Sequence, residues 1–187
     1  LLIGDANTAR AAVDEHFGDV FGLSFENQLR DKLGLRSPQE NDEEFIEATF
    51  AFLHQHRLDF TLFFRTLSRL PATVDRENQA KTDAPLRDLC IDRSACDLWL
   101  EQWRARLAQT PWPDAERQTS MLASNPKYIL RNWLAESAIQ RAKEKDFSEV
   151  NNLLACLRQP FAEQPEFERY AALPPDWARG LEVSCSS

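Results

Sequence analysis

Bulky apolar residues recur along this chain at steps of three and four residues, which is the period of an amphipathic α-helix. The pattern is clearest at residues 60–67 and 150–157, where apolar side chains occupy positions i, i+3, i+4 and i+7. Sustained alternation of polar and apolar residues with β-branched side chains, which is typical of strands, is missing from the sequence. The pattern therefore predicts an all-α fold.

The first helical pattern covers residues 13–33. Its stripe consists of Val13, Phe17, Val20, Phe21, Phe25, Leu29 and Leu33. Gly18 and Gly22 weaken its middle, so either one helix or two helices fit, and Gly34 is a natural C-terminal stop. We interpret this stripe, like the other Phe- and Trp-rich stripes of the chain, as core.

Two further helices are predicted directly after it. Ser37-Pro38-Gln39-Glu40 has the order of a capping box, and the apolar stripe at 45–53 follows it. Asp59 is placed to cap the helix that starts at Phe60. We expect these first segments to be consecutive antiparallel helices joined by short turns.

The stretch from Pro71 to Pro85 is polar and aperiodic, and it is predicted to be a long surface loop. Helical spacing resumes near Ser94 and continues to Leu107, and a shorter helix is expected over residues 114–122.

Asn125-Pro126 has the form of a helix cap followed by proline in the first turn, and a strong amphipathic pattern then runs to Ile139. Asp146 or Ser148 starts the next helix, which Pro160 stops. The prolines beyond it predict an irregular ending with one helical turn near 166–170. The expected organisation is one domain, divided into N-terminal helical hairpins (1–70), a polar loop (71–85), a second helical group (86–159) and a Pro-rich tail ending in Cys-Ser-Ser (160–187).

The composition narrows the class of protein. The formal net charge is −8, from 30 acidic and 22 basic residues, which argues against nucleic acid as a partner. Apolar runs are far shorter than the roughly 18 to 20 residues that span a membrane, and no signal peptide is visible. Four cysteines are too sparse for a disulfide scaffold, so we expect a cytoplasmic protein with mostly reduced thiols. The abrupt apolar start, Leu1-Leu2-Ile3-Gly4, leads us to expect a fragment of a longer chain.

Residues with catalytic or metal-binding spacing are sparse. The five glycines are scattered and form no phosphate-binding loop. Cys90 and Cys96 have no complementary second pair, and His54 and His56 are two apart on a helix, so neither pair is predicted to hold a metal. A strained G-x-S-x-G elbow is also missing. We therefore expect no catalytic residue, metal ligand or cofactor within this segment.

Five further residues stand out by their surroundings. Arg65 and Arg131 stand beside bulky apolar residues, and a buried arginine needs a partner, so a structural ion pair is favoured over anion binding at both. Cys96 and Cys156 lie in or beside apolar stripes and are interpreted as packing residues. Cys185 differs, because it stands on a short polar tail where packing is poor, which makes it a candidate reactive thiol.

Several segments together resemble a known family. They are residues 59–68 (DFTLFFRTLS), 125–132 (NPKYILRN), 164–177 (QPEFERYAALPPDW) and the closing Cys185-Ser186-Ser187, with 30–35 (RDKLGL) fitting the same picture. In this order they resemble the C-terminal part of the selenoprotein O family, which includes the bacterial YdiU proteins. The resemblance covers almost the whole chain.

The resemblance implies a multi-helix C-terminal domain appended to a protein-kinase-like fold and cut from it here. The family's pseudokinase-like members bind ATP in a flipped orientation with Mg²⁺ and transfer AMP to Ser, Thr or Tyr hydroxyls of target proteins. The catalytic groups belong to the upstream kinase-like region, so the resemblance assigns this segment a supporting role. Its implied partners are its own kinase-like catalytic domain and the AMPylation targets, in the bacterial cytoplasm.

The resemblance assigns a role to one residue, Cys185, which occupies the family's terminal selenocysteine or cysteine position. In bacterial relatives this residue is thought to pair with a cysteine of the kinase-like region, so Cys185 is expected to be a redox or regulatory thiol. Two alternatives remain open. In the first alternative, the chain is an autonomous, acidic helical interaction module. In the second, it is a thiol redox element on its own.

Overall fold

The computed structural model describes residues 6–178 and 181, and every regular element in those residues is a helix. The α-helices are α1 (Ala6–Leu33), α2 (Asp42–Gln55), α3 (Phe60–Leu67), α4 (Arg76–Arg87), α5 (Arg93–Gln109), α6 (Asp114–Ser124), α7 (Asn132–Lys143) and α8 (Ser148–Leu157). Two 3₁₀ helices follow, η1 (Pro165–Ala171) and η2 (Asp176–Ala178). The all-α prediction is confirmed. Among the described helices, none has the length and apolar character needed to cross a membrane.

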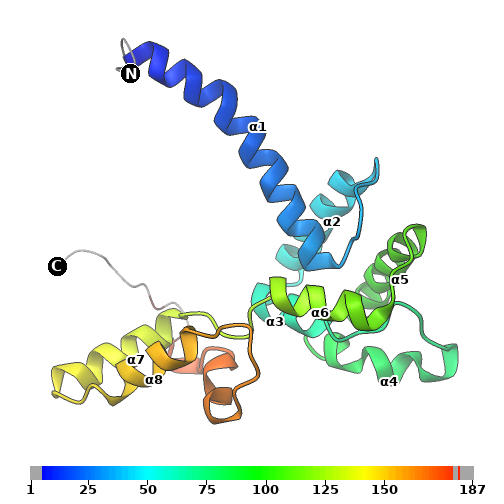
Figure 1. Ribbon diagram of the computed structural model, residues 1–187. Coiled ribbons are helices and arrows are strands. Elements are labelled where there is room, and N and C mark those ends of the chain that lie inside the picture. The colour runs from blue at the N-terminus through cyan, green and yellow to red at the C-terminus, as the bar shows by residue number, and fades with distance from the viewer. Residues whose placement is uncertain (1–5, 179–180, 182–187) are drawn as a thin grey trace.

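The first helix is continuous, which decides between the one-helix and two-helix alternatives. Its N-terminal half projects away from the other helices, and only its C-terminal end joins them (Figure 1). Gly34 ends it with a φ of +72°, as predicted, and a Cβ there would lie 2.6 Å from the Met121 sulfur. Both the backbone conformation and the close approach of α6 therefore require glycine at this stop.

The start of α2 corrects the capping-box prediction at 37–40. The helix begins at Asp42, and the residues before it form an irregular turn. The Asp42 carboxylate accepts a hydrogen bond from the Gln39 backbone N–H (3.0 Å) and is buried against Arg106, whose Nε lies 2.6 Å away. A local hydrogen bond and a long-range ion pair, both made by Asp42, thus fix this turn. The predicted cap at Asp59 is confirmed, because its carboxylate accepts from the Leu62 N–H at 2.9 Å.

The predicted loop at 71–85 is wrong for most of its length, because residues from Arg76 onward form α4. The buried residues of this helix are Asp83 and Leu86. Arg104 of α5 donates two hydrogen bonds to the Asp83 carboxylate, at 2.8 and 2.6 Å. The buried side of this helix therefore carries an ion-paired aspartate at a position where an apolar residue is usual. For that reason its sequence shows no apolar stripe.

The predicted helix start at Asn125-Pro126 is also wrong, because residues 126–131 are irregular and α7 begins at Asn132. The backbone N–H groups of Lys127 and Tyr128 both donate to the Pro160 carbonyl, at 2.8 and 3.1 Å. The Asn125 side-chain amide donates to the backbone of α1 at 2.9 Å. Tertiary hydrogen bonds satisfy these groups, so the cap-like sequence forms a connection between two parts of the fold. The predicted helical turn near 166–170 is confirmed as η1.

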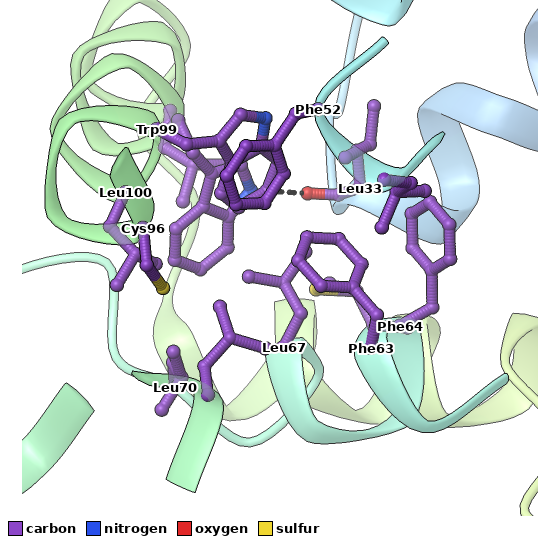
Figure 2. Packing of buried hydrophobic residues seen from close by; sticks show 14 of the residues in the cluster. Leu33, Phe52, Phe63, Phe64, Leu67, Leu70, Cys96, Trp99 and Leu100 are labelled. Carbon is purple, nitrogen blue, oxygen red and sulfur yellow. Dashed lines mark hydrogen bonds between the residues drawn. The ribbon is translucent and has the colours of Figure 1, made fainter. Parts of the chain in front are cut away.

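The core forms two clusters that divide between Met121 and Tyr128. The first collects buried side chains from α1 to α6, and the second collects those of α7, α8 and η1 with Tyr128. In the first cluster, Phe63 and Trp99, both labelled in Figure 2, pack edge to face. Their ring centres are 5.0 Å apart. The chain is thus built as two helical groups, with the division about forty residues later than the predicted loop.

Candidate functional site

The structure places the predicted site residues in different environments. Cys185 lies outside the described residues. Cys96 and Cys156 are fully buried in the first and second cluster, so their interpretation as packing residues is confirmed. In the part of the chain that the structure describes, no group of three or more His, Cys, Asp and Glu side chains could hold a metal, and that includes His54 and His56.

Arg131 forms the structural ion pair expected of it. Its guanidinium donates to both oxygens of Asp59, at 2.6 and 3.0 Å. Burial by itself raises the pKa of the Asp59 carboxyl, but hydrogen bonds from Arg131 and the Leu62 N–H outweigh burial and hold that pKa below its usual range. One carboxylate therefore caps α3 and fixes the chain that enters α7.

Arg65 of α3 links the two clusters. It is buried, and its guanidinium donates to the carbonyl oxygens of Leu122 (3.1 Å), Asn125 (2.9 Å) and Phe161 (3.0 Å). It also donates to the Glu163 carboxylate at 2.7 Å. The predicted structural ion pair is confirmed, and the three carbonyls add a second role. Arg65 holds the end of α6 and the segment after α8 against α3.

Around Arg65 lies a charged junction, which we define as Arg65, Arg69, Lys127, Glu163 and Glu168. Glu163 accepts hydrogen bonds from all three cations, with Lys127 at 2.7 Å. The hydrogen bond from Lys127, with those from the arginines, lowers the pKa of Glu163 to about 2. The junction borders a cavity of about 740 Å³. Glu163 was not predicted as a site residue, because the Pro-flanked segment around it carries no motif or periodicity that distinguishes it from other surface acids.

We expect Glu163→Gln to destabilise the protein at neutral pH and to have little effect in acid. The pKa of Glu163 is lower in the folded protein than in the unfolded chain, where it is about 4.3. Its contribution is therefore complete above about pH 5 and is lost as the pH falls from about 4 to 2. Urea unfolding of wild type and variant at several pH values measures the difference.

Glu168→Gln is the matched control for this prediction. Glu168 contacts one cation of the junction, Lys127 at 2.5 Å, whereas Glu163 contacts three. Its replacement should change the free energy of unfolding less than Glu163→Gln at pH 7. Equal effects of the two variants, or an effect of Glu163→Gln that persists unchanged at pH 2, would contradict the assigned role.

A second feature is an exposed aromatic face, which we define as Phe21 and Phe25 of α1, Phe50 of α2 and Phe60 of α3. The rings follow one another at 5.9, 6.5 and 6.2 Å between centres, each pair nearly parallel. Phe21, Phe25 and Phe60 are 55%, 46% and 41% exposed. Contiguous apolar surface of this kind marks interaction sites in soluble proteins.

This face corrects the prediction that the whole first stripe is core. Leu29 and Leu33 are buried, but the described side chains before them are exposed, namely Val13, Val20, Phe21 and Phe25. The side chain of Phe17 lies outside the described residues. The physical reason is that α2, α3 and α6 contact α1 and gather at its C-terminal end, while no other described helix lies beside its N-terminal half (Figure 1).

The aromatic face has hollows on both sides of Phe60. One, of about 520 Å³, also borders Phe50 and Arg57, and the other, of about 170 Å³, borders Lys32 and Phe64. The Lys32 ammonium lies 5.7 Å from the Phe60 ring centre and donates to the Ser124 carbonyl at 3.0 Å. Burial lowers the pKa of this lysine. Both hollows border Phe60, so they give the aromatic face relief on either side of this ring.

Comparison with known proteins adds a family relationship to this geometry. The family model described as protein adenylyltransferase SelO matches residues 3–158. The protein nucleotidyltransferase YdiU of Dechloromonas aromatica (strain RCB) is 64% identical over 186 residues, which are 100% of this chain and 37% of that protein. The YdiU proteins of Cupriavidus metallidurans and Cupriavidus pinatubonensis are 53% and 51% identical, covering 96% and 98% of this chain. They cover 32% and 35% of those two proteins, so the chain spans about a third of the length of these relatives.

Proposed function

This chain belongs to the SelO family of protein adenylyltransferases, and from that premise we propose that it is the helical supporting part of such an enzyme. The parent protein would transfer AMP from ATP to Ser, Thr or Tyr hydroxyls of target proteins in the bacterial cytoplasm. In that reaction the hydroxyl oxygen forms a bond to the α-phosphorus of ATP. The bond between the α-phosphorus and the α–β bridging oxygen breaks, and pyrophosphate leaves with that oxygen. The hydroxyl proton passes to a base.

The aromatic face carries the proposal. It exposes several large rings on three helices, and exposed aromatic surface is costly unless another surface covers it. The relatives have about two thirds of their length outside the region that this chain matches. A kinase-like lobe in that remainder is the proposed cover, and the projecting part of α1 would lie along it.

ATP and Mg²⁺ are proposed to bind to the kinase-like lobe. Mg²⁺ prefers carboxylate oxygens and phosphate, and the described residues of this chain offer no cluster of acidic side chains for it. The carboxylates of the charged junction already accept hydrogen bonds from Arg65, Arg69 and Lys127. They hold the two helical groups together and do not fit a metal ion.

The test uses the wild-type full-length protein for footprinting, and a full-length variant that combines Phe25→Ser and Phe60→Ser for the activity measurement. If these rings pack on the lobe, hydroxyl-radical footprinting should oxidise Phe25 and Phe60 several times more slowly in the full-length protein than in this chain alone. The double variant should lose about tenfold or more of AMP transfer from labelled ATP, equivalent to about 1.4 kcal/mol of lost docking.

Leu154→Ser is the control, because Leu154 is a comparably exposed apolar residue (51%) on α8, away from the aromatic face. It should leave AMP transfer unchanged. Equal oxidation of Phe25 and Phe60 in both proteins would reject the lobe as the cover. That result would favour the alternative, an autonomous acidic interaction module whose aromatic face binds a separate protein.

Cys185 completes the proposal as a redox thiol whose partner lies in the kinase-like region. The support for it is the family relationship and its position in the sequence, since it lies outside the described residues. Oxidant treatment of the full-length protein should lower transfer activity, and Cys185→Ser should remove that sensitivity while leaving the reduced activity intact.

A further inference from the structure

The two hollows beside Phe60 have basic side chains at their edges. The larger hollow, which borders Phe50, is also lined by His54 and Arg57, and the smaller one is lined by Lys32. Among the described residues, no acid lines either hollow. Acidic residues outnumber basic ones by 30 to 22 in this chain, so a surface whose ionisable groups are all basic reverses the overall charge locally.

Neither Lys32 nor Arg57 has an acidic partner in the part of the chain that the structure describes. The Lys32 ammonium donates to two uncharged acceptors, the Ser124 carbonyl at 3.0 Å and the Asn125 side-chain oxygen at 3.3 Å. An ammonium has three N–H donors, so one remains for a further acceptor. The Arg57 side chain is exposed. Both cations can therefore meet a carboxylate from another part of the protein.

The acids near the aromatic face do not neutralise these cations. Asp59 pairs with Arg131 at 2.6 Å, and Glu26 pairs with an arginine of its own helix at 3.3 Å. Asp31 and Glu47 are exposed and line neither hollow. The positive charge beside the rings is therefore left for a partner surface of opposite charge.

Arg57 stands at a position where glycine is usual. It follows the end of α2 with a φ of +51°, and the Leu58 backbone N–H donates past it to the Leu53 carbonyl at 3.0 Å. The corresponding hydrogen bond closes α1 at 2.9 Å, and there the left-handed residue is Gly34, with a φ of +72°. An arginine in this conformation strains the backbone, and such strain is concentrated at functional sites.

We propose that the aromatic face binds a segment of the covering lobe that carries both apolar side chains and carboxylates. The apolar side chains enter the hollows beside Phe60, and the carboxylates pair with Lys32 and Arg57. This inference rests on the proposed function, which supplies the lobe as the cover, and it adds the chemistry of the covering segment. Apolar burial drives such a contact, and the charge pairs fix its register.

Carbodiimide cross-linking of the full-length protein tests the pairing at Lys32. The reagent activates a carboxyl group, and an amine in contact with that group displaces the activating group to form an amide. After digestion and mass spectrometry, we expect Lys32 to be linked to an Asp or Glu outside this chain. Burial lowers the pKa of Lys32, which favours the neutral amine that the reaction needs. Lys127 is the internal positive control, because Glu163 and Glu168 lie 2.7 and 2.5 Å from it.

Substitutions of Arg57 test the second pair, with hydroxyl-radical footprinting of Phe60 in the full-length protein as the measurement. Arg57→Glu should raise the oxidation rate of Phe60 by about twofold or more, since like charges then oppose each other across the contact. Arg57→Lys should leave the rate unchanged, because it keeps the charge. Arg57→Gly should also raise the rate, although it removes the backbone strain and should not lower the urea midpoint of unfolding.

The outcomes separate this inference from the proposed function. If the rings are protected in the full-length protein and Lys127 is linked, but Lys32 is unlinked or linked only to acids of this chain, the acidic segment is overturned and the lobe remains the cover. Unchanged oxidation of Phe60 in Arg57→Glu would overturn it as well. If Phe25 and Phe60 are oxidised equally in the full-length protein and in this chain alone, both the inference and the proposed function fail.

Discussion

Arg65→Ala is expected to lower the free energy of unfolding by about 3–5 kcal/mol. The substitution removes one guanidinium that three backbone carbonyls and Glu163 share, at distances of 2.7 to 3.1 Å. Each buried carbonyl that loses its donor costs about 1–3 kcal/mol. Because these carbonyls belong to both helical groups, the variant should also separate their unfolding. Urea denaturation followed by circular dichroism measures both effects.

Arg93→Ala is the control for this prediction. Arg93 also forms an ion pair, at 2.7 Å from Asp88, but both side chains are 62% exposed. Exposed pairs contribute about 0–1 kcal/mol, so Arg93→Ala should change little. Arg65→Lys should give an intermediate loss, because an ammonium keeps the charge but lacks the planar fork that reaches four acceptors. A loss below 1 kcal/mol for Arg65→Ala would show that Arg65 does not hold the groups together.

Trp103→Ala is expected to cost about 3–5 kcal/mol, the typical loss for truncating a buried large aromatic side chain. Trp103 is fully buried in α5, and its indole N–H donates to the Leu33 carbonyl at the end of α1 (2.9 Å). Its ring packs nearly parallel to Trp99 at 6.4 Å, with the Arg117 guanidinium 5.2 Å from its centre. The variant therefore leaves a large cavity and an unpaired carbonyl.

Trp177→Ala is the matched control, since Trp177 is 60% exposed in η2 and its loss should change stability by less than about 1 kcal/mol. Trp103→Phe should fall between the two, because it keeps most of the packing but leaves the Leu33 carbonyl without a donor. Similar losses for Trp103→Ala and Trp177→Ala would mean that the first cluster is not organised around α5.

Several elements could be predicted from the sequence because their cause is local. Asp59 precedes an apolar repeat and caps α3, and Gly34 ends α1 in a conformation that favours glycine. The pattern at 150–157 forms α8, although only Leu153 of its four apolar stripe residues is fully buried. Neighbouring residues were sufficient evidence for these elements.

The failures share a different cause. Residues 76–87 lack an apolar stripe because the buried Asp83 is paired with Arg104, twenty-one residues away. Asn125-Pro126 has a helix-start sequence, yet the next two backbone N–H groups donate to Pro160. In each case a contact with a residue distant in the sequence overrides the secondary structure that the local residues favour.

The candidate site was predicted only in part. The pattern indicated that Arg65 and Arg131 need partners, and the structure supplied Glu163 and Asp59. The role of the Glu163 carboxylate was not predicted, because it depends on three cations that the fold brings to it from distant parts of the sequence. The aromatic face was predicted as core, since periodicity shows that a helix side is apolar and does not show what covers it.

The sequence by itself determined that this chain is helical, where most of its helices lie, and the family to which it belongs. These properties follow from short-range periodicity, from caps and from residue identities read in order. Only the tertiary structure decided that Leu29 and Leu33 are buried while Phe21 and Phe25 are exposed. The physical reason is that burial and contact are set by which segments pack together, and the same apolar stripe fits a core or a docking surface equally well.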